Sequence, residues 1–416
     1  MAKTKIDDLY ANMFSEDVVD PSKKDTKVKT WYDIGNYALN YTCSKNLQGA
    51  IASGRITGIE GLGSTGKSLF GLSVFKDPKI DLCIVIDTEG GGNSRELMEF
   101  VGVPMEKIRV LKAHTFSCYK ISKADGSREE VSDKDVPKKL ETDKFRYVLG
   151  VTYQMKKIVD SFSLDPNLQN KNIVIVLDSI ANLQSVRELS GGYDMGKRAQ
   201  EIGIFFRTFD NALENTNIGF IYTNKLYTNF GNVYDPWKSV GGENVFYNSS
   251  LILRLATSSE TDDVSESDIK ADKKNKNTSL GNTYTTSMCR ITKSRFGTKN
   301  RSCQYLIDSQ FGLTRYSGLF RLLSDFKIII SPSSGWYALP VLWGEEKFRK
   351  KDFISLFRKD ETENVLKLQK ALDAREEEIK NERREFNESG VADVEESQDL
   401  QDEEDILMEE ILGETE

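Results

Sequence analysis

The chain has 416 residues, enough for two or three domains with a sizeable hydrophobic core. It has one histidine, His114, and five cysteines without a Cys-x-x-Cys pair, which argues against histidine-based hydrolysis, a disulfide framework and a zinc site. No apolar run approaches the roughly 20 residues that cross a membrane, so we expect no membrane partner and no signal peptide.

The net charge of −8 is unevenly distributed. Residues 385–416 contain 14 acidic and no basic residues, so the rest of the chain carries +6. A mildly basic body with an acidic tail suits a protein that handles a polyanion, although a merely solubilising tail explains the charge equally well.

The first 30 residues contain apolar side chains at helical spacing, namely Ile6, Leu9, Tyr10, Met13 and Phe14. This pattern predicts a short amphipathic helix, which a polar linker follows. Because one helix cannot bury its apolar face alone, it either folds back or docks on a neighbouring molecule.

Residues 61–68 match the G-x-x-x-x-G-K-[ST] spacing of a P-loop, between a predicted strand at 55–59 and a predicted helix at 69–75. Glycines in such a loop let backbone N–H groups surround phosphate oxygens. Lys67 is expected to reach the β- and γ-phosphates, and the Ser68 hydroxyl to bind Mg²⁺. A plain glycine-rich turn is the alternative. The predicted nucleotide-binding residues are Gly61, Leu62, Gly63, Ser64, Thr65, Gly66, Lys67, Ser68 and Leu69.

Two later apolar runs read as buried parallel strands that end in acidic residues. Residues 82–86 lead into Asp87-Thr88-Glu89, and residues 172–177 lead into Asp178. Glu89 is a candidate to polarise the water that attacks a γ-phosphate, or else a surface carboxylate at a strand end. Asp178 fits the Walker B acid, which orients Mg²⁺, usually through water.

Between these runs, residues 117–145 are polar and charged and predict an exposed insertion. Helices are predicted around 148–159 and from 197 to about 214, with a flexible loop at 191–196 between the second acidic run and the later helix. A strand at 218–223 ends at Asn224.

A long loop is predicted at 225–243. It mixes Lys225 and Lys238 with the rings of Tyr227, Phe230, Tyr234 and Trp237. Cations beside stacking rings suit single-stranded nucleic acid. The alternative is an ordinary loop whose rings pack into the body.

The remaining chain predicts a strand at 251–255, an insertion at about 257–285 and a strand pair at 289–296 and 304–308. A small C-terminal unit at 316–370 follows, and then a charged helix and the acidic tail at 371–416. The expected domains are therefore an N-terminal helix and linker at 1–30, a core at 31–315, the small unit and the tail.

The order of these motifs resembles the RecA family of strand-exchange ATPases, and most closely the phage UvsX-type recombinases. The resemblance spans residues 33–337 apart from the two insertions. It rests on the P-loop, Ile86-Asp87-Thr88-Glu89, Val176-Leu177-Asp178-Ser179, Thr223-Asn224, Gly241-Gly242, Lys293-Ser294-Arg295, and the segment from Tyr316-Ser317-Gly318 to Gly335-Trp336-Tyr337.

The resemblance implies an α/β fold with a RecA-like P-loop ATPase core, a central, mostly parallel sheet, an N-terminal oligomerisation helix and a small C-terminal domain. ATP and Mg²⁺ are the implied ligands. Glu89 and Asp178 are the implied catalytic carboxylates, and Asn224 senses the γ-phosphate. Lys293 and Arg295 reach the ATP of the next subunit. The implied DNA contacts are Met195, Gly196, Arg207, Gly241 and Gly242, beside Lys225, Tyr227, Phe230, Trp237 and Lys238.

The function so implied is an ATP-dependent recombinase in a cytoplasm, that of the host if a phage encodes it. It is expected to form helical filaments on single-stranded DNA, pair them with double-stranded DNA, and work with single-strand-binding and loading-mediator proteins. A replicative helicase motor and a non-hydrolysing recombination mediator are the alternatives. Gln200 replaces a DNA-contacting arginine of the family, and Leu97 or Glu96 replaces the tyrosine that stacks on adenine.

Overall fold

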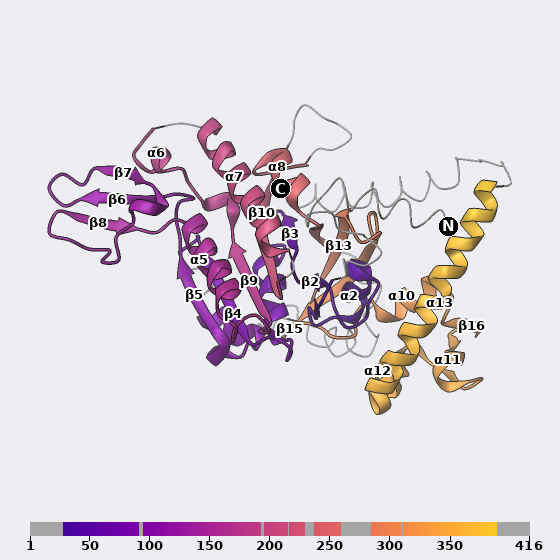
Figure 1. Ribbon diagram of the computed structural model, residues 1–416. Helices are drawn as coiled ribbons and strands as arrows, with labels where there is room; N and C mark the ends of the chain where they lie inside the picture. Colours follow the sequence, from indigo (N-terminus) through magenta and orange to yellow (C-terminus); the bar gives the residue numbers. More distant parts are fainter. Residues whose placement is uncertain are drawn as a thin grey trace, which may run out of the picture.

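The computed structural model describes residues 28–90, 95–192, 195–214, 216–228, 237–258, 284–308 and 311–388. The predicted N-terminal helix, nearly all of the second insertion and the acidic tail from 389 onward lie outside these residues. Figure 1 shows a central sheet flanked by helices, with a small sheet projecting at one end and a C-terminal unit at the other.

The fold is α/β, with a large mixed sheet of mostly parallel strands in the order β15-β14-β13-β12-β3-β10-β9-β4-β5, while β11 pairs with β10. The run from β12 to β5 is parallel, and β13, β14 and β15 continue the sheet antiparallel. The strands are β3 (Ile56–Gly61), β4 (Leu82–Asp87), β5 (Ile108–Lys112), β9 (Ile173–Asp178), β10 (Ile218–Thr228), β11 (Trp237–Ser239), β12 (Leu251–Ser258), β13 (Tyr284–Ser294), β14 (Ser302–Asp308) and β15 (Gly312–Leu313).

Helices cover both faces of this sheet, which is why its central strands are apolar throughout. In β9, Val174 and Val176 pack on one face with helices α2, α3 and α4. Ile175 and Leu177 pack on the other face with α5 and α7. The strands predicted from apolar runs are therefore confirmed, as is the strand pair predicted at 289–296 and 304–308, which the structure forms as the antiparallel strands β13 and β14. The helices of the core are α2 (Tyr37–Ser44), α3 (Lys67–Ser73), α4 (Arg95–Val101), α5 (Val151–Leu164), α6 (Val186–Leu189), α7 (Met195–Leu213) and α8 (Gly242–Asn248).

The exposed insertion predicted at 117–145 contains strands that the sequence did not indicate. Strands β6 (Cys118–Ser122), β7 (Arg128–Val131) and β8 (Phe145–Val148) form an antiparallel sheet in the order β7-β6-β8. It projects from the core beside α6 (Figure 1). Cross-strand ion pairs such as Lys120–Glu129, at 2.8 Å, hold the hairpin together where an apolar pattern is missing.

Two predicted loops are shorter than expected. Helix α7 begins at Met195, so Met195 and Gly196 lie in its first turn and not in a loop. Strand β10 continues to Thr228 and pairs with β11 in an antiparallel hairpin. This hairpin forms because Leu226 and Trp237 are buried on its inner face. Of the expected long loop, residues 229–236 are outside the described part.

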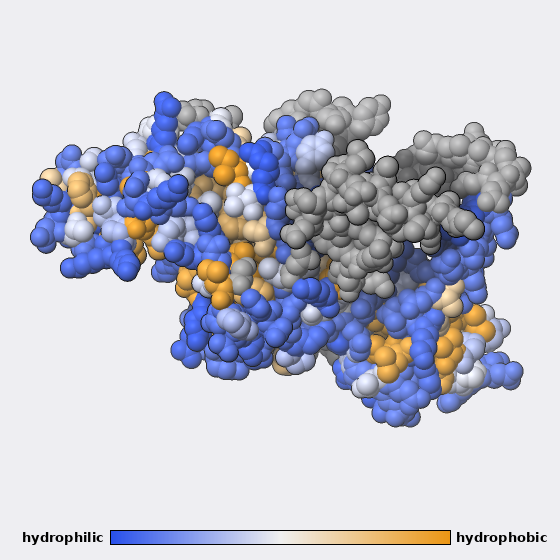
Figure 2. Space-filling model, in the orientation of Figure 1, coloured by the Kyte–Doolittle hydropathy of each residue, from blue (hydrophilic) through white to orange (hydrophobic). Residues whose placement is uncertain are grey.

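The C-terminal unit packs on helix α2 through a separate apolar cluster that includes Tyr41, Leu323, Phe357 and Leu368. The long helix α13 begins at Glu361, so it crosses the boundary expected at 370. Figure 2 shows hydrophobic surface over this unit. No helix in the described ranges is both long enough and apolar enough for a membrane span. The unit contains α10 (Leu319–Asp325), β16 (Ile330–Ser333), β17 (Trp336–Ala338), α11 (Pro340–Trp343), β18 (Lys347–Phe348), α12 (Phe353–Phe357) and α13 (Glu361–Glu388); β1 (Trp31–Tyr32) and β2 (Ile51–Ala52) pair next to α2.

Candidate functional site

The candidate site lies at the carboxyl ends of strands β3, β4, β9 and β10, where parallel sheets place their ligands. The strand register brings their ends together, because Asp87 lies beside Asp178 and Lys225 lies beside Gly61. Four segments that are far apart in sequence thus supply the side chains of one site.

The predicted P-loop runs from the end of β3 into α3. Ser64 and Gly66 have positive φ angles of 62° and 82°. A Cβ atom on Gly61 would lie 2.7 Å from the carbonyl oxygen of Leu255, so only glycine fits without a shift. The loop therefore lies close to β12 at Gly61, where a side chain would not fit.

Lys67 is half-buried, and its ammonium donates a hydrogen bond to the carbonyl oxygen of Leu62 in the same loop. Burial lowers the pKa of Lys67, and the charge of Lys225 lowers it further, while the carboxylates of Asp178 and Glu89 raise it. An anionic ligand would offset this burial. A lysine in this setting is suited to binding phosphate oxygens.

Asp178 is 2% exposed at the end of β9, and the Thr223 hydroxyl of β10 donates a hydrogen bond to its Oδ1. The Thr88 hydroxyl donates to the carbonyl oxygen of Ser179 at 2.8 Å, which ties the end of β4 to that of β9. These contacts fix the Asp178 carboxylate beside the P-loop. Together with the Ser68 hydroxyl it could hold a magnesium ion, in part through water.

Glu89 lies at the rim of this site, and its side chain is 30% exposed. Its Oε1 accepts a hydrogen bond from Asn182 Nδ2 at 2.7 Å and lies 3.7 Å from Lys225 Nζ. Asp87 Oδ1 accepts from the backbone N–H groups of Glu89 and Gly90, at 3.0 and 3.2 Å, and so shapes the turn. The strand-end carboxylate is thus oriented by its neighbours.

Asn224 is fully buried, and its Nδ2 donates a hydrogen bond to the carbonyl oxygen of Val240 at 2.8 Å. Val240 precedes Gly241 and Gly242, both of which have positive φ angles at the start of α8. Asn224 therefore connects β10 to the segment that begins with the predicted DNA contacts Gly241 and Gly242.

Lys293 and Arg295 are far from this site within one chain. The register places Lys293 beside Ile252, and Ile252 beside Gly58, in the first half of β3, whereas the P-loop leaves its other end. Lys293 and Arg295 both donate hydrogen bonds to the carbonyl oxygen of Tyr247, at 2.9 Å. Burial, followed by the charge of Arg295, lowers the pKa of Lys293 to about 8.

The residues predicted to contact nucleic acid differ in solvent exposure. Lys225, Tyr227 and Lys238 are exposed. Trp237 is only 8% exposed, so it packs inside the protein and is not presented to a base, which is the alternative foreseen for these rings. Arg207 is exposed on α7, about 18 Å along the helix from Met195. Phe230 lies outside the described residues.

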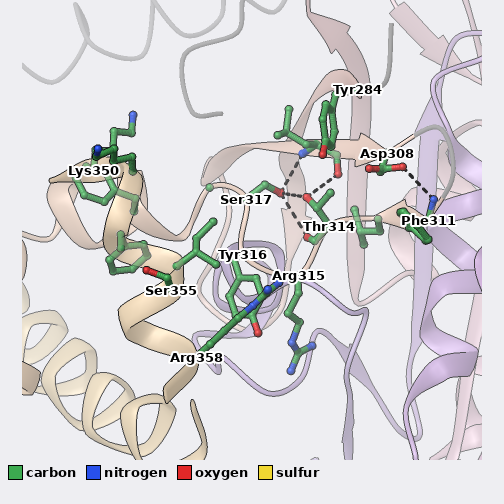
Figure 3. A pocket seen from close by; sticks show the side chains of 17 residues that line it. Tyr284, Asp308, Phe311, Thr314, Arg315, Tyr316, Ser317, Lys350, Ser355 and Arg358 are labelled. Carbon is green, nitrogen blue, oxygen red and sulfur yellow. Dashed lines mark hydrogen bonds between the residues drawn. The ribbon is translucent and has the colours of Figure 1, made fainter. Parts of the chain in front are cut away.

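A second hollow is a cleft of about 520 Å³ between β13–β15 and the C-terminal unit. Figure 3 shows Arg315, Tyr316 and Arg358 at one side of it, and the Ser317 and Thr314 hydroxyls in mutual hydrogen bonding. Its lining does not include Lys67, Glu89 or Asp178, so it is separate from the site at the strand ends.

Thr88, Ser179 and Thr223 belong to motifs recognised in the sequence but had no predicted role, and Asn182 was missed. Asn182 follows Asp178 by four residues, in the short 3₁₀ turn Ile180–Asn182 that returns it to Glu89. A polar residue one turn beyond a strand-end acid was the available signal. Comparison of the chain with protein-family models finds no matching family, and comparison with curated proteins finds no match.

Proposed function

We propose that the protein is a RecA-like, DNA-dependent ATPase that forms helical filaments on single-stranded DNA and catalyses homologous pairing and strand exchange. The observation that carries this proposal is the convergence of Lys67, Glu89 and Asp178 at one edge of the sheet, where the parallel strands β3, β4 and β9 end. The exposed cation Lys225, at the base of the β10–β11 hairpin, lies in the same place.

In this proposal ATP binds with its phosphates on the P-loop amides and Lys67. Ser68 and Asp178 would hold Mg²⁺, which would supply charge neutralisation at the phosphate oxygens. Glu89 orients the attacking water and accepts its proton. The buried Asp178 stays in place through the Thr223 hydrogen bond.

The location of Lys293 and Arg295 supports a site shared between subunits. The register places Lys293 level with Gly58, two strands away from β3, and not at the end of β3 that leads into the P-loop. In a head-to-tail assembly the same surface faces the next subunit, where the two cations would stabilise the charge that develops on the transferred phosphoryl group. This arrangement predicts a filament in which ATP lies at each interface.

Single-stranded DNA would bind the exposed face of the β10–β11 hairpin through Lys225, Tyr227 and Lys238. It would also contact the region around Gly241. Double-stranded DNA, single-strand-binding protein and loading mediators are the further partners of this proposal, and a host cytoplasm is its place of action.

Electron microscopy with single-stranded DNA and a non-hydrolysable ATP analogue tests the assembly. We expect regular helical filaments that need both ligands. Closed rings would favour the helicase alternative. Single particles that bind DNA without nucleotide would favour the mediator, and either result would overturn the recombinase proposal.

A further inference from the structure

The hairpin of β10 and β11 has one buried and one exposed face. Leu226 and Trp237 lie on the buried face, where Leu62 of the P-loop packs against their cluster. Lys225, Tyr227 and Lys238 are exposed, and Tyr227 is the direct cross-strand partner of Lys238. Because side chains alternate along a strand, Lys225 and Tyr227 point to the same, exposed face, and Lys238 lies beside Tyr227 on it.

Lys225 lies where two pairings of β10 meet. It is the last residue of β10 in register with β3, as the partner of Gly61. The next residue, Leu226, is the first in register with β11, as the partner of Ser239. Lys225 therefore belongs both to the P-loop end of the sheet and to the hairpin.

The Lys225 side chain reaches across to the end of β4. Its Nζ lies 3.7 Å from Glu89 Oε1 and donates to Asn182 Oδ1 at 3.5 Å. Asn182 Nδ2 donates to the same Glu89 oxygen at 2.7 Å, and the Ser179 hydroxyl lies 3.4 Å from it. One oxygen of the carboxylate is thus surrounded by donors, and the direction of Glu89 is fixed by them.

We propose that Lys225 is a positioning residue that couples strand binding to ATP hydrolysis. Without nucleic acid, Lys225 and Asn182 hold Glu89 in this orientation. When a single strand lies on the exposed hairpin face, the Lys225 ammonium pairs with a backbone phosphate and Glu89 is released toward the attacking water. The inference rests on the proposed function, and it names the regulation of that site.

The exposure of the pair makes this exchange feasible. The Lys225 side chain is 52% exposed and that of Glu89 is 30% exposed. An ion pair with this much contact with water contributes little free energy, so a phosphate at the same face can compete for the lysine. The contacts that remain on Glu89, from the Asn182 amide and the Ser179 hydroxyl, come from neutral donors, which bind a carboxylate more weakly than a cation does.

The test measures steady-state ATP turnover of the full chain with and without oligothymidylate, for the wild type, Lys225→Ala and Lys225→Arg. We expect DNA-free kcat of Lys225→Ala to rise about two- to fivefold, as expected for loss of an exposed ion pair, with KM for ATP unchanged. The stimulation by DNA should fall toward one. Lys225→Arg keeps a cation and should restore wild-type stimulation. Lys138→Ala, at an exposed lysine of the insertion, is the matched control and should behave as wild type.

The outcomes separate this inference from the proposed function. A wild type that is stimulated by the strand, with Lys225→Ala stimulated by the same factor, overturns the role of Lys225 and leaves the ATPase proposal standing. If ATP turnover of Lys225→Ala falls by the same factor with and without oligothymidylate, the role of Lys225 is likewise overturned. Such a result indicates a cation that aids hydrolysis without linking it to DNA. A wild type without ATP turnover overturns both proposals.

Discussion

Glu201 of α7 accepts a hydrogen bond on Oε1 from the Ser117 hydroxyl at 3.0 Å, at the base of the projecting insertion. Glu201 is 5% exposed, and its Oε2 is buried without a hydrogen-bond partner among the described residues. A carboxylate in this position is costly when ionised. Helix α7 and the insertion are therefore joined through a group that favours its protonated form.

This joint predicts a pH-dependent stability. Burial raises the pKa of Glu201 from 4.5 to about 7; the charges of Glu130 and Glu188 add to the rise, while Ser117 and Lys197 oppose it. The folded state then holds a proton that the unfolded state releases above about pH 4.5, so stability falls as pH rises from there to about 7 and is level beyond. The loss amounts to at most about 3 kcal/mol.

Urea denaturation between pH 5 and pH 8 checks this expectation, with Glu201→Gln as the comparison. Glutamine keeps an acceptor for Ser117 but cannot ionise, so this variant should lack that slope and be more stable than wild type at pH 8. Identical slopes for the two proteins would show that Glu201 ionises normally in the folded protein.

The P-loop glycines differ in what surrounds them. A Cβ on Gly61 would meet the Thr65 hydroxyl at 2.5 Å as well as the Leu255 carbonyl, whereas a Cβ on Gly63 would meet nothing within 4 Å. We expect Gly61→Ala to lower the unfolding free energy by about 1–3 kcal/mol and Gly63→Ala to change it by less than about 0.5 kcal/mol. Chemical denaturation of the two variants measures the difference, and equal effects would contradict the close approach of β12 to the loop.

The two described aromatic residues of the hairpin should respond in opposite ways to truncation. Trp237 is buried, so Trp237→Ala should lower the unfolding free energy by about 3 kcal/mol. Tyr227 is 47% exposed, so Tyr227→Ala should keep stability within about 0.5 kcal/mol and weaken binding of oligothymidylate, by about 1–3 kcal/mol for one stacked base. Denaturation and fluorescence anisotropy measure these quantities. If Tyr227→Ala is stable and binds oligothymidylate as tightly as the wild type, the hairpin is not part of the DNA-binding surface.

A site shared between subunits predicts complementation between two inactive variants. Glu89→Gln lacks the water-orienting carboxylate, and the double substitution Lys293→Ala with Arg295→Ala lacks the cations for the neighbour. Mixed in equal amounts, they should restore activity at about a quarter of the interfaces, where an intact Glu89 meets an intact Lys293. ATP turnover of the mixture measures this, and a mixture as inactive as its components would argue that both sets act within one chain or not at all.

Part of the fold and site was predictable because some residues carry local patterns. Apolar runs that end in Asp87 and Asp178 indicate strands buried on both faces, and the P-loop spacing is explicit. The pairing of Thr223 with Asp178, and of Lys225 with Glu89, depends on the order of strands in the sheet, which no local pattern specifies. The insertion strands were missed because their short, charged segments hold together by cross-strand pairs. Trp237 could not be assigned from composition, since an exposed and a buried ring look alike in sequence.

We propose that the site formed by Lys67, Glu89 and Asp178 hydrolyses ATP in response to a single DNA strand. The most direct measurement is the ATP turnover number of the purified full chain with and without oligothymidylate, beside Glu89→Gln under the same conditions. We predict that single-stranded DNA increases the ATP turnover number of the wild type. The variant Glu89→Gln should bind ATP and the DNA strand but should not hydrolyse ATP. Equal wild-type turnover with and without the DNA strand, or undiminished turnover in Glu89→Gln, would show that this site is not a DNA-dependent ATPase.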